Sequence, residues 1–303
     1  MSELRETDLP ALYQSADKLA QAGQTRAKVF IGSELLMLIL AGASGVTTWR
    51  LGPAQIDVLA TVGAVAFLAA LGITTARITR KPENDWYIGR AAAESVRTLA
   101  WCYTVGGDPF PITPTQSQSD ASERFLERLR EILDELDDVE LAITSVEAHE
   151  ISPAMRAKRA EGLDDRRATY LRARISDQLG WYQRRSLRHR RAANRWVAVA
   201  VIATVLGLIA AVLKAIGVYD TDILGVAASC ATSAIGWSQT SQHRTLVSSY
   251  ALAARELSLI RDQVIHVAPD DWPLFVSDAE DAISREHTMW LARHGHPGMP
   301  RRR

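Results

Sequence analysis

Residues 196–213 read WVAVAVIATVLGLIAAVL and contain no charged side chain. Three further stretches are uncharged in the same way: 35–49 (LLMLILAGASGVTTW), 58–76 (VLATVGAVAFLAALGITTA) and 223–242 (ILGVAASCATSAIGWSQTSQ). Since an α-helix rises about 1.5 Å per residue, about 20 residues cross a hydrocarbon layer of roughly 30 Å. The alternative is a set of buried helices in a large soluble bundle, but such helices usually keep a polar face, which these stretches lack. The sequence therefore predicts four membrane spans, the weakest being 223–242, which is rich in Ser, Thr and Gln.

The four stretches come in pairs, because short turns at 50–57 and 214–222 join the first two and the last two. Each pair is expected to form a transmembrane hairpin. A cleavable signal peptide at the first stretch is the alternative, but the 1–28 segment that precedes it is long for the basic region of such a peptide. The predicted fold class is an all-α integral membrane protein, with two transmembrane helical hairpins and a cytoplasmic helical bundle or coiled coil.

The composition excludes several other classes of protein. The 303 residues carry 35 basic and 35 acidic side chains, so no net charge favours binding to nucleic acid. A hydrophobic content of 47% excludes a disordered chain. The two cysteines, Cys102 and Cys230, are too few for a disulfide-stapled fold, and packing is the role expected of both.

The positions of Lys and Arg indicate the orientation of the spans. Basic residues lie before the first span, after the second, before the third and after the fourth, whereas the two turns carry only Arg50 and Lys214. By the positive-inside rule, both termini and the 77–195 segment are expected on the cytoplasmic side of the inner membrane. The arginine cluster consists of Arg184, Arg185, Arg188, Arg190, Arg191 and Arg195. Because the cluster directly precedes a span, anionic lipid headgroups fit it better than nucleic acid does.

Glu34 directly precedes the first apolar stretch, near the inner interface. Its carboxylate is expected either to snorkel or to pair with Arg77, Arg80 or Lys81. The alternative is a proton or ion role within the membrane, which is less common for a charge so close to the interface.

The fourth stretch carries small and polar residues at heptad spacing. The polar stripe consists of Gly225, Ser229, Thr232, Gly236 and Gln239. The same spacing continues from His243 to Val264 with mostly apolar residues, which predicts one continuous helix over about 223–265. Small residues favour close helix packing in lipid, and a polar stripe can also line a water-filled pore. A pore would require a homo-oligomer, because one striped helix cannot enclose it.

Cytoplasmic helices are expected after each hairpin. Pro82 interrupts the second span, and a new helix is predicted from Glu83. After a loop at 104–120, apolar residues recur at heptad spacing, which predicts either a coiled-coil seam or one face of a cytoplasmic bundle. This heptad series consists of Phe125, Leu129, Ile132, Leu136, Val139, Ile143 and Val146. Since each half contains a hairpin followed by a helix, we infer an internal duplication.

No catalytic motif is present. The sequence has no GxxxxGK[ST] phosphate loop, no GxSxG and no HExxH. His287, His294 and His296 could hold a metal, but the last two fall in a Gly-, Pro- and Arg-rich tail that is expected to be disordered. We therefore expect no enzyme activity, no metal and no cofactor.

Several motifs resemble the SLATT family, the bacterial SMODS- and SLOG-associating two-transmembrane domains. Resemblance to one branch of the family is carried by residues 8–17 (DLPALYQSAD), Trp86, Arg90, Ala93, Glu94, 101–103 (WCY) and 106–110 (GGDPF). Resemblance to a second branch is carried by 151–156 (ISPAMR), Tyr170, Leu171, Arg174, Ile175, 177–182 (DQLGWY), Glu280, Glu286, His287 and Trp290. The resemblance covers most of the chain, in two copies.

This resemblance implies a first two-span domain at 1–110, a linker with an amphipathic helix at 111–150, a second two-span domain at 151–292 and a basic tail at 293–303. It also implies a membrane effector of a bacterial conflict or defence system, oligomeric and pore-forming or membrane-perturbing. Because no nucleotide-sensing domain is recognised in the chain, the trigger is expected from a nucleotide-sensing partner protein. The alternative is a membrane-anchored scaffold that recruits a signalling partner through 120–190.

Overall fold

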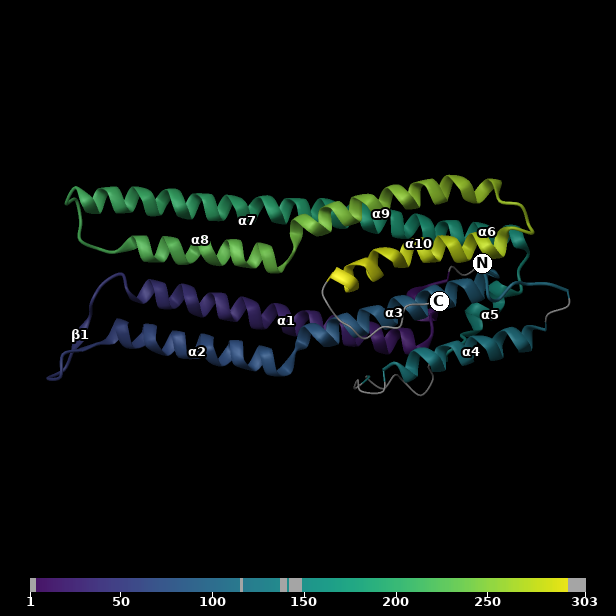
Figure 1. Ribbon diagram of the computed structural model, residues 1–303, viewed down its shortest axis with the longest axis horizontal. Coiled ribbons are helices and arrows are strands. Elements are labelled where there is room, and N and C mark those ends of the chain that lie inside the picture. The colour runs from purple at the N-terminus through teal and green to yellow at the C-terminus, as the bar shows by residue number, and fades with distance from the viewer. Residues whose placement is uncertain (1–3, 115–116, 137–140, 142–148, 294–303) are drawn as a thin grey trace. The chain divides into compact units, whose positions relative to one another are not determined.

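The computed structural model describes residues 4–114, 117–136, 141 and 149–293, with side chains as far as Ser284. Among these residues the regular secondary structure is helical, apart from one short antiparallel strand pair, which confirms the all-α class (Figure 1). In chain order the elements are η1 (Glu6–Asp8), α1 (Ala11–Ser44), β1 (Arg50–Leu51), β2 (Ile56–Asp57), α2 (Val58–Arg80), α3 (Pro82–Val105), α4 (Gln118–Asp134), α5 (Pro153–Arg159), α6 (Leu163–Tyr170), the π-helical turn η2 (Leu171–Ser176), α7 (Asp177–Ala215), α8 (Ile223–Thr240), α9 (His243–Gln263), η3 (Val264–His266) and α10 (Trp272–Arg293).

The chain divides into two compact units, and neither is a continuous stretch of sequence. The hairpin unit consists of Thr25–Pro82 and Arg185–Ser248. The bundle unit consists of Met1–Gln24, Glu83–Arg184 and Ser249–Arg303. Each unit therefore combines segments from both halves of the sequence.

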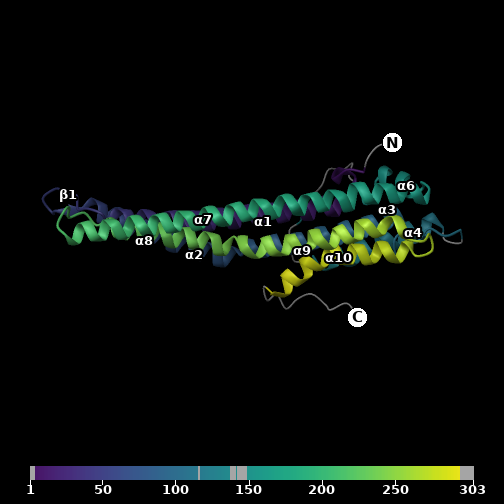
Figure 2. The same cartoon turned by 90° about the horizontal axis from the view of Figure 1, so that it is seen from above.

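In the hairpin unit, α1 pairs with α2 and α7 pairs with α8 as two helical hairpins (Figures 1 and 2). The first hairpin turns at the β1–β2 pair, where Gly52 has a left-handed φ of 74°. The second turns after Ala215, where Gly217 has a left-handed φ of 76°. The Asp222 amide donates to the Val46 carbonyl at 3.3 Å, so both turns lie at the same end of the unit.

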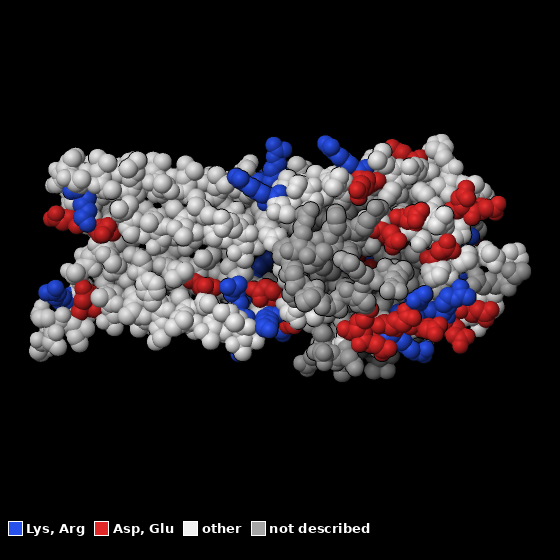
Figure 3. Space-filling model, in the orientation of Figure 1, with Lys and Arg blue, Asp and Glu red and all other residues white. Residues whose placement is uncertain are grey.

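Three helical stretches are long and apolar enough to cross a membrane: Ala11–Ser44, Val58–Val105 and Leu163–Ala215. Between 11% and 17% of their apolar windows is buried within the chain. Figure 3 shows the visible face of the hairpin unit as largely uncharged surface, with Lys, Arg, Asp and Glu gathered towards its ends. The fourth predicted stretch forms α8, which is not among these three candidates of the described chain, because its Ser, Thr and Gln side chains lower its mean hydropathy.

The continuous helix predicted over 223–265 is wrong. α8 ends at Thr240 and α9 begins at His243, because Gln242 has a left-handed φ of 47° that ends the helical hydrogen-bond ladder. The first hairpin ends in the same way, since Lys81 has a φ of 42° and α3 begins at Pro82. A heptad count missed the break because residue spacing along the sequence does not report backbone conformation. The two halves are therefore more alike in backbone than their residues indicate.

The core of the bundle unit is formed by helices from both halves of the chain. The Tyr103 ring of α3 lies 5.8 Å from that of Phe110 and 4.8 Å from that of Phe125 of α4, measured between centroids. Phe125 and Leu129 are buried in the same core. The described part of the heptad series thus packs within the chain, which favours the bundle interpretation over an intermolecular coiled coil. The remaining members, Val139, Ile143 and Val146, lie outside the described residues.

Side chains from three other helices close the C-terminal end of α3. Arg159 of α5 donates to the carbonyl of Tyr103, and Arg166 of α6 donates to that of Val105 at 2.6 Å. The indole of Trp272, on α10, donates to the same Val105 carbonyl at 2.9 Å. The last carbonyls of a helix have no partner within it, so these contacts satisfy them. They also fix α5, α6 and α10 around the end of α3.

Candidate functional site

The polar stripe lies along α8 and its members differ in exposure. Gly225, Thr232 and Gln239 are exposed, whereas Ser229 and Gly236 are partly covered by neighbouring helices. Ser229 Oγ donates to the carbonyl of Gly225 at 2.8 Å, which satisfies its hydroxyl within the helix. The exposed members are accessible to lipid, to water or to another copy of the chain.

Small residues bring α8 close to both α1 and α7. A Cβ atom added to Gly42 of α1 would lie 2.2 Å from Ser229 Oγ. A Cβ atom added to Gly207 of α7 would lie 2.9 Å from the Cβ of Ala227. Both distances are shorter than real side chains tolerate, so each glycine is required for the approach of its helix to α8.

Glu34 binds α2 within the hairpin unit. Its carboxylate lies 3.7 Å from Arg77 Nε and accepts a hydrogen bond from Thr74 Oγ1 at 2.9 Å. Glu34 therefore pairs with Arg77, which is one of the partners expected from the sequence. These contacts link α1 to α2 near the end of the first hairpin that lies away from its turn.

The arginine cluster lies on α7, immediately before its apolar stretch. All of its members except Arg185, which is partly buried, are exposed. Arg184, Arg188, Arg191 and Arg195 follow one another at intervals of three or four residues, so they lie on one face of the helix. Their guanidinium groups are therefore placed to bind an anionic surface together.

A pair of histidines that the sequence did not single out joins α7 to α9 beside this cluster, outside the apolar stretches. The Nδ1 atoms of His189 and His243 lie 3.0 Å apart. Burial, then the neighbouring His243 and Arg185, lower the pKa of His189 to about 4, and burial lowers the pKa of His243. Both rings are therefore neutral at pH 7, and one ring donates a hydrogen bond to the other. No sequence pattern could have paired them, because the pairing depends on the register of the second hairpin.

The bundle unit contains a buried charged network that the sequence also left without a role. Arg174, on η2, is fully buried and donates to the two carboxylate oxygens of Glu280 at 2.9 and 2.6 Å and to Glu94 at 3.3 Å. The hydroxyls of Tyr170 and Thr98 also donate to Glu280, at 2.9 and 3.1 Å. Burial alone would lower the pKa of Arg174, but Glu280 and then Glu94 raise it above its ordinary value. The guanidinium therefore stays charged and links α3, η2 and α10.

The contacts described above are packing contacts, ion pairs and hydrogen bonds. Among the described residues, no group of three or more His, Cys, Asp or Glu side chains is placed to hold a metal ion. Burial raises the pKa of the Cys102 thiol well above its ordinary value, so it is not a nucleophile at neutral pH. Cys230 lies partly covered on α8. The histidines of the C-terminal tail lie outside the described side chains.

Three helical stretches long and apolar enough to cross a membrane, together with a helical bundle that has its own core, are typical of a helical membrane protein. Residues 10–167 match the family model of the SMODS and SLOG-associating 2TM effector domain 3, and residues 170–290 match that of the SMODS and SLOG-associating 2TM effector domain 1. The chain therefore belongs to the SLATT family, with two tandem domains, as its motifs predicted. Comparisons with curated proteins and with solved structures found no match.

The two family matches meet at residues 167–170, just before η2. The 151–156 motif, whose residues resemble the second branch, falls within the first match. In the structure, Arg159 and Arg166 dock α5 and α6, which follow this motif, on the end of α3. Both family domains contribute a hairpin to the hairpin unit and helices to the bundle unit.

Proposed function

We propose that the chain crosses the inner membrane four times with both termini in the cytoplasm, and that copies of it assemble into a pore or another membrane-perturbing structure. The exposed apolar surface of the hairpin unit carries this proposal. A water-soluble protein would bury such helices, and large exposed apolar surfaces mark membrane or partner contacts. The description of both family models as effector domains supports a role in damaging the membrane and not only in anchoring.

Three observations support α8 as the fourth span. Its 18 residues extend about 27 Å, close to the thickness of a hydrocarbon core. The hydroxyls of Ser229 and Thr240 donate to carbonyls of their own helix at 2.8 and 2.9 Å, which reduces the cost of placing them in lipid. The close approach to Gly207 of α7 is typical of helices that pack in membranes.

The exposed members of the polar stripe would line the pore. Thr232 and Gln239 lie on the surface of α8, where a second copy of the chain can meet them. One such helix cannot enclose a channel, so several copies are required. The arginine cluster would hold each copy at the cytoplasmic surface by binding anionic headgroups.

The trigger would come from a nucleotide-signalling partner, because both matched models describe domains associated with SMODS and SLOG modules. The scaffold function is less well supported. The apolar face of α4 and the buried face of η2 pack within the bundle unit, so recruitment through them would require that unit to open.

Dye release from anionic phospholipid vesicles tests the pore. We expect leakage with the purified chain, and at least about tenfold slower leakage with Thr232→Leu or Gln239→Leu, because an apolar lining excludes water. Thr75→Leu, a matched change on the exposed surface of α2, should leave leakage unchanged.

A second experiment tests whether a partner protein triggers the pore. The chain is produced in cells together with the products of neighbouring genes, and the membrane potential is followed. Two results together would contradict pore formation and favour the scaffold function: vesicles that retain their dye at every protein-to-lipid ratio, and cells that keep their membrane potential.

A further inference from the structure

The first turn of the hairpin unit is a small β-hairpin, formed by β1 and β2, and not an irregular loop (Figure 1). Arg50 of β1 lies opposite Asp57 of β2, and Leu51 lies opposite Ile56. Successive side chains of a strand point to opposite faces of a sheet, and residues that lie opposite each other share a face. One face of this β-hairpin is therefore apolar, with Leu51 and Ile56, and the other is charged, with Arg50 and Asp57.

Trp49 extends the apolar face. It lies two residues before Leu51, which places the two side chains on the same side of an extended chain. Two contacts hold Trp49 beside the strands, because its amide donates to Asp57 Oδ1 at 3.3 Å and its carbonyl accepts from the Val58 amide at 2.8 Å. Trp49, Leu51 and Ile56 are 56%, 51% and 58% exposed, so the turn presents three large apolar side chains to its surroundings.

Hydrogen bonds to α2 fix the position of the charged face. The Asp57 carboxylate caps α2 by accepting from the amides of Leu59 and Ala60, at 3.0 and 3.2 Å. Neither this carboxylate nor the Arg50 guanidinium can be moved into an apolar layer without a large cost in free energy. The charged face must therefore remain in water or among polar headgroups. Because the two faces are opposite, a β-hairpin that lies flat on a membrane can place its apolar face in lipid at the same time.

The surroundings of the β-hairpin indicate that lipid covers its apolar face. The exposed apolar surface of α2 continues up to it, since Val62 and Val65 near the start of that helix are exposed. The second turn lies at the same end of the hairpin unit, and its Ile216 is exposed as well. Turns that face water are usually built from polar residues, glycine and proline, whereas tryptophan is enriched where membranes meet water. Both turns thus continue the apolar surface of the helices that they join.

We propose that the apolar face of the β1–β2 hairpin binds the outer leaflet of the inner membrane, at the boundary between headgroups and acyl chains. Trp49, Leu51 and Ile56 enter this boundary, while Arg50 and Asp57 face the water and the headgroups. The β-hairpin thereby holds the turn at the membrane surface and sets the depth of α1 and α2. This inference rests on the proposed membrane topology and goes beyond it, because a turn that projects into the periplasm would satisfy the same topology.

Fluorescence quenching of the full chain in phosphatidylglycerol vesicles tests the proposal. In a chain with Cys102→Ala and Cys230→Ala, an environment-sensitive fluorophore is attached to Leu51→Cys or, as the matched control, to Gln55→Cys at the exposed tip of the same β-hairpin. A lipid that is spin-labelled near the headgroup end of its acyl chain should quench the first at least about threefold more than the second, because only the first lies in lipid. Iodide on both sides of the vesicle should give the reverse order.

A second labelled position guards against damage to the turn by the first substitution. Ile56→Cys lies directly opposite Leu51 on the same face, so its fluorophore should also be quenched by the spin-labelled lipid and shielded from iodide.

Flotation of the vesicles on a density gradient reports insertion separately. A chain that does not float with the vesicles would overturn the proposed topology together with this inference. A chain that floats but shows equal iodide quenching at Leu51→Cys, Ile56→Cys and Gln55→Cys would overturn the inference alone. Shielding of the first two from iodide without quenching by the labelled lipid would also overturn it, because a protein surface would then cover the apolar face.

Discussion

Glu34 and Glu280 are both acidic residues paired with arginine, but their surroundings differ. The Glu34–Arg77 pair keeps side-chain exposures of 22% and 30%, whereas Glu280 and Arg174 are each 0% exposed. A partly exposed ion pair contributes little to stability, because solvent screens it. A buried charge that loses its partner is costly, because nothing replaces the lost solvation. The residues that matter most for the bundle unit are therefore the buried ones.

Replacing Glu280 tests this difference at the residue scale. Glu280→Gln keeps the side-chain volume but leaves Arg174 with only the Glu94 carboxylate at 3.3 Å. We expect the free energy of unfolding to fall by about 3 kcal/mol, measured by denaturation in detergent. Glu256→Gln, on the exposed surface of α9, should change it by less than about 0.5 kcal/mol. If the two variants were equally stable, the network would not hold the bundle unit together.

At the scale of elements, each hairpin is followed by a sharp turn with one residue in the left-handed region. Lys81 and Gln242 occupy this position in the first and second halves. Pro82 made the first turn predictable, since proline cannot continue the ladder. The second turn has no proline or glycine, so its sequence resembled a continuous helix. A different feature, a single glycine, allows close packing between the two hairpins: Gly42 of α1 faces Ser229 of α8.

A glycine substitution tests that packing. Gly42→Ala places a Cβ 2.2 Å from Ser229 Oγ, so we expect a loss of about 1–2 kcal/mol in stability, measured by thermal unfolding in micelles. Gly72→Ala in α2 is the control, because nothing lies within 4 Å of its added Cβ, and it should be neutral or slightly stabilising. Adding Ser229→Gly to Gly42→Ala should restore stability. A similar loss in both single variants would show that helix contact is not the cause.

At the scale of the whole molecule, the two family domains do not coincide with the two compact units. Each domain divides between a unit with apolar surface and a unit with a polar surface and its own core. This division follows from the surroundings that each segment requires. The apolar helices suit lipid, and the amphipathic helices of both domains bury their apolar faces against one another.

Labelling of single cysteines tests the number of spans. In a chain with Cys102→Ala and Cys230→Ala, we expect a membrane-impermeant maleimide to label Ala54→Cys and Val218→Cys in intact spheroplasts, because each lies in a turn between paired helices. Ser119→Cys and Arg261→Cys should react only after lysis. If α8 did not cross the membrane, Arg261→Cys would be labelled in intact spheroplasts, and the four-span topology would fail.

The sequence by itself determined the helical hairpins, their pairing and the family. A long uncharged stretch can be recognised from its own residues. When a short turn joins two such stretches, they can pair only with each other as a hairpin. Neither prediction depends on residues far away in the sequence. Pro82 and the positions of Lys and Arg are local signals of the same kind.

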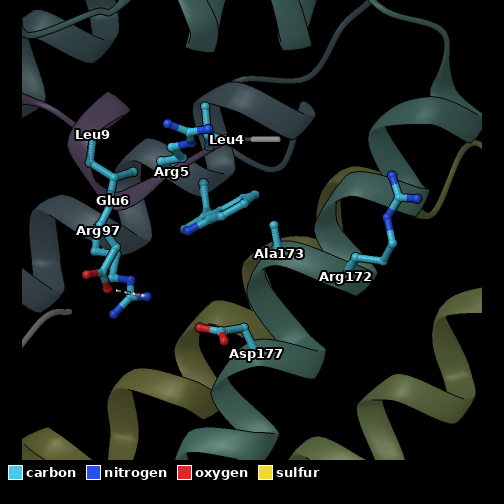
Figure 4. A pocket seen from close by; sticks show the side chains of 9 residues that line it. Leu4, Arg5, Glu6, Leu9, Arg97, Arg172, Ala173 and Asp177 are labelled. Atoms are coloured by element: carbon cyan, nitrogen blue, oxygen red, sulfur yellow. Dashed lines mark ion pairs between the residues drawn. The ribbon is translucent and has the colours of Figure 1, made fainter. Parts of the chain in front are cut away.

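Only the tertiary structure decided which polar residues meet. Arg174 and Glu280 are 106 positions apart, and Glu94 and Arg174 are 80 apart, so no spacing rule could pair them. A cavity lined by Arg97 and Trp101 likewise arises where three separate segments pack together (Figure 4). A buried hydrogen bond depends on the direction and distance of groups brought together by packing, and those are set by the whole core rather than by any one stretch of sequence.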